Sequence, residues 1–302
     1  MPKRFTRRAT TEHRNPRTRG IDLRPAREIL RAMNREDAGV ARAVARAIPQ
    51  IADAVDAIEE ALRRGGRLVY AGAGTSGRLA ALDAAECPPT FGVPRGMVVA
   101  LIAGGQRALT EAVEGAEDNA GAGARDVRRV RASKRDVVVG LSASGRTPYV
   151  LGALEAARRA GAKTVAVVCN RGSAAARAAD IAIEAETGPE AITGSTRLKA
   201  GTAQKLILNM LSTGAMIRLG RVYDNWMAGV AQTNRKLRAR ALGILEQASG
   251  AGPAAARKAL TSAHGDLRIA LVMLKRGVTR LQAEFALAAA GGDLRRALGE
   301  RK

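Results

Sequence analysis

The sequence predicts an α/β fold in which a parallel sheet is flanked by helices in a doubly wound arrangement. Short, almost wholly apolar runs recur between residues 67 and 186, and the clearest of them close in Gly or Asn. Segments with the apolar spacing of helices lie between several of these runs. Strands that helices cover on both faces have this near-continuous apolar character, whereas strands with one wet face alternate.

The first 64 residues predict a basic arm followed by helices. Residues 1–20 hold seven Lys and Arg against one acid, Glu12, and show no apolar face, which predicts a flexible or draped segment. Residues 24–64 predict helices, because apolar side chains such as Ile48, Ile51 and Val55 recur at spacings of three and four before a glycine stop.

The rest of the chain predicts strands first and helices last. A helix is clearest over 148–161, a long apolar helix is expected over 199–219, and the remainder shows only short helical patterns. The expected strands are 67–74, 97–105, 136–145, 164–170 and, as a fifth, 181–186. The predicted domains are 1–55 (arm and helices), 56–235 (the α/β domain) and 236–302 (a small helical domain).

Composition and charge limit the class of protein. The formal charge is +22, yet only 2% of residues are aromatic and the arginines are spread along the chain, which argues against a nucleic-acid partner and suits a phosphorylated ligand. Two cysteines, Cys87 and Cys169, build no disulfide framework. No apolar run approaches the ~18 residues of a bilayer span, and no signal peptide is evident. The expectation is a cytoplasmic protein without a membrane partner.

Two hydroxyl-rich loops predict a phosphate site. "GAGTSGR" (72–78) and "SASGRTP" (142–148) each follow an expected strand and open an expected helix. The first is not a P-loop and fits a dinucleotide fingerprint poorly, because its third glycine is displaced. Ser and Thr cap helices routinely, but two such loops at strand ends suit a phosphomonoester better. The candidate phosphate ligands are Thr75, Ser76, Ser142, Ser144, Gly145 and Thr147.

These loops resemble those of the sugar isomerase (SIS) domain, a phosphosugar-binding α/β fold. Longer stretches narrow the resemblance to the N-acetylmuramic acid 6-phosphate etherase family. They are "AGAGTSGRLAALDAAECPPTFG", "LIAGGQRALTEAVEGAEDNA", "VVVGLSASGRTPYV" and "ITGSTRLKAGTAQKLILNMLSTGAM", together with "TEHRNPRTRGID" near the start. The resemblance covers roughly residues 11–300 and is weakest after about 240.

The resemblance implies release of D-lactate from N-acetylmuramic acid 6-phosphate, by elimination and then addition of water, with no metal or organic cofactor. That chemistry needs an acid and a base. By motif match the catalytic glutamates fall on Glu86, the implied proton donor, and on Glu117, for which we infer the role of base. Glu86 is expected to follow a short helix that starts at the first loop, so that it can lie close to the bound sugar. From the residues alone, Glu114, Glu117 and Asp118 of "EAVEGAEDNA" (111–120) are better explained as a solvated cluster at a helix end, and the motif match reverses that interpretation.

Four basic residues each have two possible interpretations from the sequence. Lys199 and Lys205 either steer the substrate or lie on a plain helix surface, and Arg78 and Arg146 invite the same alternatives. Cys87 is expected to be a small buried residue.

Competing functions also stay open. They are a phosphosugar isomerase, a non-catalytic sugar-phosphate sensor on the same fold, and, from charge alone, a nucleic-acid-binding protein. The expected helix 199–219 is apolar around much of its circumference, more than one sheet face can bury, which predicts a homodimer. The resemblance implies that the two copies share a site.

Overall fold

The computed structural model describes residues 9–230 and 235–300. The chain divides into two compact units, the first of Met1–Ala84 with Met97–Ser212 and the second of Ala85–Gly96 with Thr213–Lys302. Two helices, α4 (Gly74–Phe91) and α8 (Lys199–Arg218), begin in the first unit and end in the second. The three-part division of the sequence at residues 55 and 235 stays a prediction.

The first unit is built on a parallel sheet with the strand order β2-β1-β3-β4-β5. All five apolar runs form its strands, the short fifth one included, so the predicted α/β class is confirmed. The strands are β1 (Leu68–Gly72), β2 (Val98–Ile102), β3 (Val137–Ser142), β4 (Lys163–Val168) and β5 (Ile181–Glu184).

The strand order changes direction at β1. Tyr70 in β1 is paired with Ala100 of β2 on one side and with Val139 of β3 on the other. The chain thus runs from β1 outward to β2 and then crosses back to place β3 beside β1. In open α/β sheets, this switch point is where the strand ends leave a crevice for ligands.

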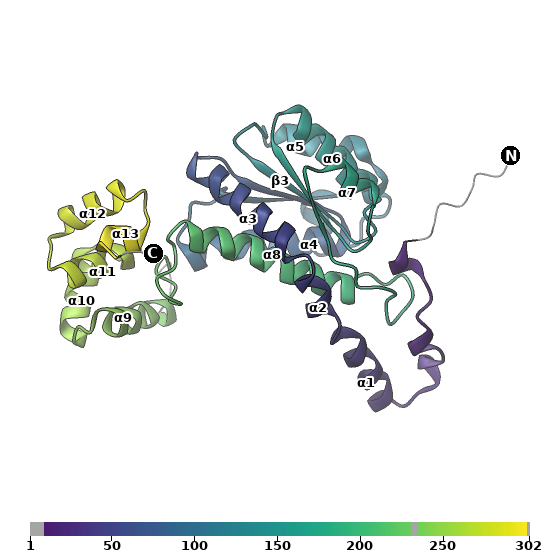
Figure 1. Ribbon diagram of the computed structural model, residues 1–302, viewed down its shortest axis with the longest axis horizontal. Coiled ribbons are helices and arrows are strands. Elements are labelled where there is room, and N and C mark those ends of the chain that lie inside the picture. The colour runs from purple at the N-terminus through teal and green to yellow at the C-terminus, as the bar shows by residue number, and fades with distance from the viewer. Residues whose placement is uncertain (1–8, 231–234, 301–302) are drawn as a thin grey trace. The chain divides into compact units, whose positions relative to one another are not determined.

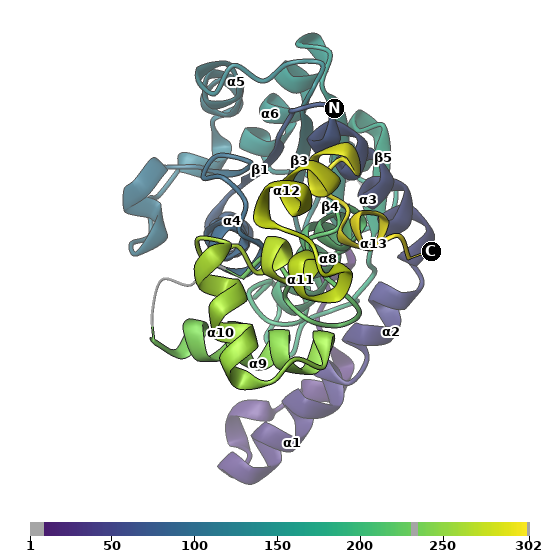
Figure 2. The same cartoon turned by 90° about the vertical axis from the view of Figure 1, so that its left-hand side faces the viewer.

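Helices cover both faces of the sheet (Figures 1 and 2). One face carries α5 (Ala120–Arg129), α6 (Pro148–Arg159) and α7 (Ala174–Ala178). Val69 and Val138 point into the core on that side. The other face carries α3 (Ile48–Arg63) and the first-unit turns of α4 and α8.

A buried polar chain ties α4 and α8 to that second face. The Tyr70 hydroxyl donates to Asp83 Oδ2 (2.9 Å), and the Ser212 hydroxyl donates to Asp83 Oδ1 (3.0 Å). Asp83 belongs to α4 and Ser212 to α8. Because an unsatisfied buried polar group is expensive, these bonds contribute to the packing of α4 and α8 against β1.

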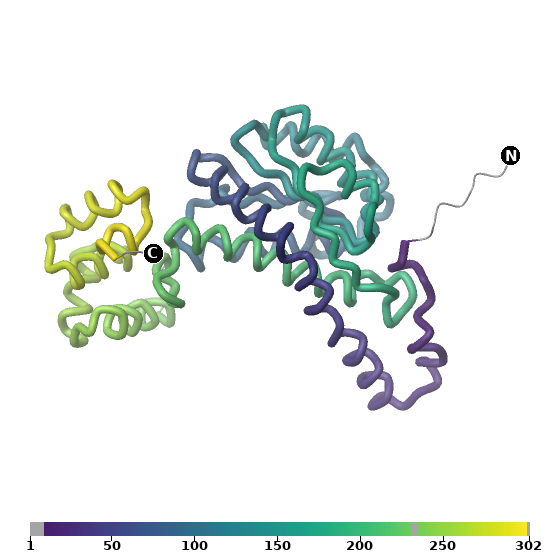
Figure 3. The backbone as a smooth tube through the Cα atoms, viewed as in Figure 1, coloured from purple at the N-terminus to yellow at the C-terminus, as the bar shows by residue number. Residues whose placement is uncertain are grey.

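The N-terminal segment is draped, as one of the two sequence alternatives proposed. Its short helices η1 (Thr10–Glu12), η2 (Pro16–Thr18) and η3 (Ile21–Leu23) precede α1 (Ala26–Asp37) and α2 (Val40–Ala45). The trace in Figure 3 passes beside the segment that leads into α8. Asn15 Nδ2 donates to the Pro189 carbonyl oxygen (3.3 Å), and the Thr18 hydroxyl donates to the Ala191 carbonyl oxygen (2.8 Å).

Buried charges meet at the N-terminus of α8. Glu36 of α1 accepts from Arg17 (2.5 and 2.9 Å) and from Lys199 Nζ (2.7 Å). The side chains of Glu36 and Lys199 are only 3% and 4% exposed. Glu190 then accepts the backbone N–H groups of Lys199 and Ala200, both at 2.9 Å, which satisfies two of the free donors of the helix.

The second unit is helical through most of its length, as predicted for the C-terminal region. Its core includes Leu245, Leu271 and Leu294. Asp266, Thr279 and Asp293 cap three of its helices through side-chain oxygens. The helices are α9 (Arg235–Ser249), α10 (Pro253–Ser262), α11 (Leu267–Arg276), α12 (Arg280–Ala289) and α13 (Leu294–Leu298). Across residues 9–230 and 235–300, no helix has the length and apolar character that crossing a membrane requires.

Candidate active site

The structure brings the two hydroxyl-rich loops together. Gly72, the last residue of β1, is paired with Leu141 of β3, directly before Ser142. The loops therefore leave neighbouring strands at the same edge of the sheet, at the switch point. Helix α4 begins at Gly74 and α6 at Pro148. Two helix N-termini, each with a partial positive charge, thus follow adjacent strand ends.

The first loop is tight because glycine lets α4 descend onto the strand ends. A Cβ on Gly77 would lie 2.6 Å from Ile102 Cγ1 and 2.8 Å from the Gly72 carbonyl oxygen. Thr75 is half-buried, whereas Ser76 is buried and its hydroxyl donates to Gln204 Oε1 of α8 (2.8 Å). Thr75 and Ser76 thus occupy the first turn of α4, with only Thr75 partly open to solvent.

The second loop is organised around the buried Ser142. Its Oγ accepts the Gly145 N–H (2.9 Å) and shares a hydrogen bond with Thr147 Oγ1 (2.8 Å). Ser144 Oγ accepts the Arg146 N–H (3.2 Å) and, like Thr147, is half-buried. Gly145 has φ +66°, a conformation that other residues rarely adopt. The loop is therefore preorganised by its own hydroxyls, and Ser144 and Thr147 are its partly open ones.

Asn170 holds this loop from behind. Its Nδ2 donates to the Ala143 carbonyl (2.8 Å) and to Thr11 Oγ1 (3.0 Å), and its Oδ1 accepts from Thr10 Oγ1 (2.9 Å). Asn170 ends the expected strand 164–170, but nothing in the sequence pointed to a bond with Ala143. The draped N-terminal segment thereby supports the second loop.

Comparisons with known proteins identify the family. A model of the glucokinase regulatory protein N-terminal SIS domain matches residues 50–158, and an SIS domain model matches residues 121–214. N-acetylmuramic acid 6-phosphate etherases from Cronobacter sakazakii and Brucella anthropi are 54% and 52% identical to this chain. The alignments cover 95% and 98% of this chain and 97% and 96% of those proteins. The chain belongs to the N-acetylmuramic acid 6-phosphate etherase family. The family resemblance read from the sequence motifs is confirmed.

In this etherase-family chain, Glu117 lies beside the second loop's helix. It is exposed, in the short helix η5 (Ala116–Asp118), and η5 contacts α6. Asn119 then caps α5 by accepting the Ala122 N–H (2.9 Å). Helices α5 and α6 pack backbone to backbone, because a Cβ on Gly152 would lie 2.0 Å from the Ala120 carbonyl oxygen. This packing places the segment around Glu117 close to α6, which opens at the second loop.

Arg78 fixes the other side of that segment. Its Nε donates to the Leu109 carbonyl (3.2 Å) and its Nη2 to that of Glu111 (2.7 Å). Arg78 belongs to the early turns of α4, so the first loop's helix is bonded to the segment between η4 (Gly105–Leu109) and η5. The sequence had suggested that Arg78 either steers the substrate or lies on a plain helix surface. Neither interpretation includes these bonds, through which Arg78 holds the backbone of the segment after η4.

Glu86 requires a correction. The sequence predicted a short helix that ends before Glu86, whereas α4 continues through Glu86, Pro88 and Pro89 to Phe91. A proline lacks its own N–H, but its carbonyl still accepts, and the Gly92 N–H donates to the Pro88 carbonyl (2.9 Å). Gly229 also packs on this last turn, since a Cβ there would lie 2.2 Å from the Phe91 carbonyl oxygen. Glu86 is exposed on the C-terminal half of α4.

The other residues considered in the sequence analysis differ in how deeply they are buried. Lys199 is a buried ion-pair partner of Glu36, so neither of its sequence readings holds. Lys205 is half-buried on α8 and donates to Asn209 Oδ1 (2.6 Å), one turn further along the same helix. Cys87 is buried, as expected. Burial also raises the pKa of the Cys169 thiol to about 12, which makes it a poor nucleophile.

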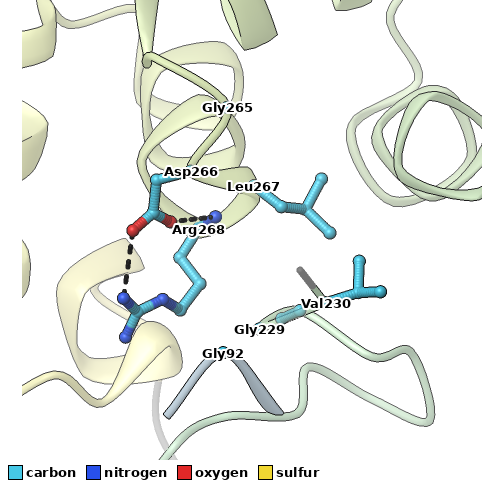
Figure 4. Close-up of a pocket in the computed structure, with 8 residues that line it drawn as sticks. Gly92, Gly229, Val230, Gly265, Asp266, Leu267 and Arg268 are labelled. Atoms are coloured by element: carbon cyan, nitrogen blue, oxygen red, sulfur yellow. Dashed lines mark hydrogen bonds and ion pairs between the residues drawn. The ribbon is translucent and has the colours of Figure 1, made fainter. Parts of the chain in front are cut away.

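Figure 4 shows a pocket that belongs to the second unit alone. It encloses about 160 Å³ between the turn at Gly92, the stretch Ala228–Val230 and the start of α11. Asp266 there accepts from Arg268 Nη2 (3.0 Å). None of the predicted catalytic or phosphate-binding residues lines this pocket. Within the described residues, no group of three or more His, Cys, Asp or Glu side chains is arranged to hold a metal ion.

Proposed function

We propose that this protein is an N-acetylmuramic acid 6-phosphate etherase, which releases D-lactate and leaves N-acetylglucosamine 6-phosphate. The observation that carries the proposal is the pairing of two hydroxyl-bearing loops at the β1–β3 switch point, in a chain of the etherase family. Two helix N-termini and partly open hydroxyls suit a dianionic phosphate. The candidate phosphate ligands are Thr75, Ser76, Ser142, Ser144, Gly145 and Thr147.

The chemistry follows from the open-chain sugar. Its C1 aldehyde acidifies the C2 proton, which a carboxylate base removes. The C3–oxygen bond then breaks, an acid protonates the departing lactate oxygen, and an α,β-unsaturated aldehyde remains. Water adds at C3, activated by the same group that has just lost its proton, and the base returns its proton to C2. The elimination and addition together consume one water molecule.

Two glutamates fill these roles in the proposal. Glu117 is the base at C2, and its exposed position on η5, next to α6, supports access to a sugar held by the second loop. Glu86 is the acid that protonates lactate and then activates water. Both side chains are exposed to solvent and neither is held in a buried ion pair. The reaction as written uses no metal or cofactor.

A homodimer with a shared site completes the proposal, with a cytoplasmic location. Helix α8 buries Leu208 and Leu211, yet Met210 is 39% exposed on the same helix. Ile217, two turns further along α8, is 51% exposed, so two large apolar side chains lie on one exposed face of this helix, which supports an interface between copies.

The deciding experiment supplies N-acetylmuramic acid 6-phosphate and measures D-lactate. A phosphosugar isomerase would convert a sugar phosphate without releasing lactate, and a sensor would bind without turnover. Glu86→Gln and Glu117→Gln should each lower the rate by ~10²–10⁴-fold, because Gln cannot exchange protons. Glu114→Gln, three residues before Glu117 and also exposed, is the matched control and should keep normal turnover.

The two roles are separated by deuterium exchange at C2, followed by NMR in heavy water. Glu86→Gln should still exchange the C2 proton, because abstraction precedes departure of lactate, whereas Glu117→Gln should lose both reactions. The opposite exchange pattern would reverse the roles. Normal lactate release by both variants would refute the assignment.

A further inference from the structure

Gln204 stands out as a buried polar side chain with an unused donor. It lies on α8, is 1% exposed, and its Oε1 accepts the Ser76 hydroxyl (2.8 Å). Its Nε2 is buried, and no acceptor for it exists among the described residues. Buried donors are rarely left unpaired in folded proteins, so this one calls for an explanation.

The neighbourhood of Gln204 is the first turn of α4. One turn earlier on α8, Gly201 faces Thr75, since a Cβ built at Gly201 would lie 3.4 Å from Thr75 Cγ2. Gln204 then meets Ser76. The N-terminal half of α8 therefore packs along the residues proposed to bind phosphate, and its one amide contacts one of their hydroxyls.

The hydrogen-bond pattern seen here is a poor one for binding an anion. A serine hydroxyl has one proton, and Ser76 gives it to Gln204 Oε1. In this state Ser76 can only accept, and a phosphate oxygen also only accepts. The Gln204 amide, turned by 180° about its last bond, would instead donate Nε2–H to Ser76 Oγ and release the hydroxyl proton.

We propose that Gln204 is a positioning residue that directs the Ser76 hydroxyl toward the substrate phosphate. With phosphate bound, the amide donates to Ser76 Oγ, and Ser76 donates to a phosphate oxygen. The anion accepts the Ser76 hydroxyl proton, one amide N–H of Gln204 gains Ser76 Oγ as its acceptor, and Gln204 Oε1 takes the position that Nε2 holds here. The inference rests on the proposed function only for the location of the phosphate.

Variants of Gln204 have distinct expected effects. Gln204→Glu replaces the turnable amide with a group that only accepts when ionised and adds a negative charge, so affinity for inorganic phosphate and for N-acetylglucosamine 6-phosphate should fall more than tenfold. Gln204→Met has similar length but no polar atoms to orient Ser76, and affinity should fall about three- to tenfold. In turnover, KM should rise while kcat stays within about twofold.

A double-mutant cycle tests whether Gln204 acts through Ser76. Dissociation constants for both ligands are measured by calorimetry in the unsubstituted enzyme, Ser76→Ala, Gln204→Met and the double variant. If the inference holds, Gln204→Met has less than a twofold effect once Ser76 is alanine. Ser212→Ala, which removes another buried hydroxyl bond of α8, is the matched control and should leave both affinities unchanged.

The outcomes separate the two proposals. Independent, multiplicative losses in the cycle would overturn the positioning role while leaving the phosphate site intact. Equal losses in Ser212→Ala would show that the effect is general to α8 packing and would overturn it as well. If the unsubstituted enzyme released lactate but Ser76→Ala bound both ligands normally, the inference would fail while the proposed function stood. If the unsubstituted enzyme bound neither ligand, the phosphate site itself would be refuted.

Discussion

At the scale of single residues, the polar side chains that matter most are paired across long sequence distances. Ser76 meets Gln204, Arg78 bonds to the carbonyl groups of Leu109 and Glu111, and Asn170 reaches Ala143. Each bond links a loop of the proposed site to a different element. The hydroxyls predicted from the sequence therefore make up only part of the proposed site. The side chains that hold the two loops in place, such as Gln204 and Asn170, make up the rest.

Glu36 provides a pH dependence that can be measured. Its hydrogen bonds with Arg17, ahead of those from Lys199, lower the pKa of the carboxyl from 4.5 to about 2, although burial opposes this. A carboxyl whose pKa is lower in the folded state stabilises the fold above the unfolded pKa. That stabilisation, about 3 kcal/mol at most, is lost as the pH falls from about 5 toward 2.

We therefore expect Glu36→Gln to lower the free energy of unfolding most at pH 7, where Lys199 would be left buried without its carboxylate. The difference from the unsubstituted protein should shrink as the pH is lowered, which urea unfolding at pH 7, 5 and 3.5 would measure. Glu60→Gln, at an exposed ion pair with Arg64, should show no such trend. A difference that stays constant with pH would contradict this account.

At the scale of elements, the packing of α5 on α6 determines where the segment of Glu117 lies. The Tyr149 hydroxyl of α6 donates to Asp126 of α5 (2.7 Å), and burial together with this bond raises the pKa of Tyr149. Gly152 and Gly123 allow the two backbones to touch. Small residues at these points serve close approach, as they do at tight helix interfaces elsewhere.

We expect Gly152→Ala to destabilise the protein by about 1–3 kcal/mol, because the new methyl group would overlap the Ala120 carbonyl. Since α5 would have to move, lactate release should fall as well. Gly243→Ala is the matched control, because Gly243 lies within α9 and nothing approaches its Cβ position within 4 Å. That change should stabilise by about 0.5–1 kcal/mol. Equal thermal unfolding midpoints for the two variants would contradict the packing argument.

At the scale of the whole molecule, the proposed homodimer rests on α8. Light scattering at micromolar concentration should give twice the mass of one chain. Met210→Lys should shift the mass toward the monomer, because burying an unpaired charge in an interface is costly. Leu281→Lys changes a side chain that is 69% exposed on α12 and should leave the dimer intact. A monomeric unsubstituted protein, or equal effects of both changes, would refute an interface at α8.

The sequence by itself determined the elements and the two loops, because strands, helix stops and hydroxyl-rich turns are local patterns. All five strands and the long helix α8 appear where the apolar runs place them. The continuation of α4 through Pro88 and Pro89 was not foreseen, because the packing of Gly229 on its last turn is not local.

Only the tertiary structure decided which segments meet. The pairing of β1 with β3 brings Gly72 to Leu141 across 69 residues, and no local pattern encodes that neighbour. From the sequence, Lys199 had two equally good interpretations, substrate steering and helix surface, because its partner Glu36 lies 163 residues away. Nothing in the sequence marked Gln204 as part of the site, because a single glutamine in a helix is an ordinary surface residue. Its burial and its hydrogen bond with Ser76 are known only from the structure. Local periodicity specifies elements, whereas desolvation and pairing over long sequence separations are properties of the folded chain.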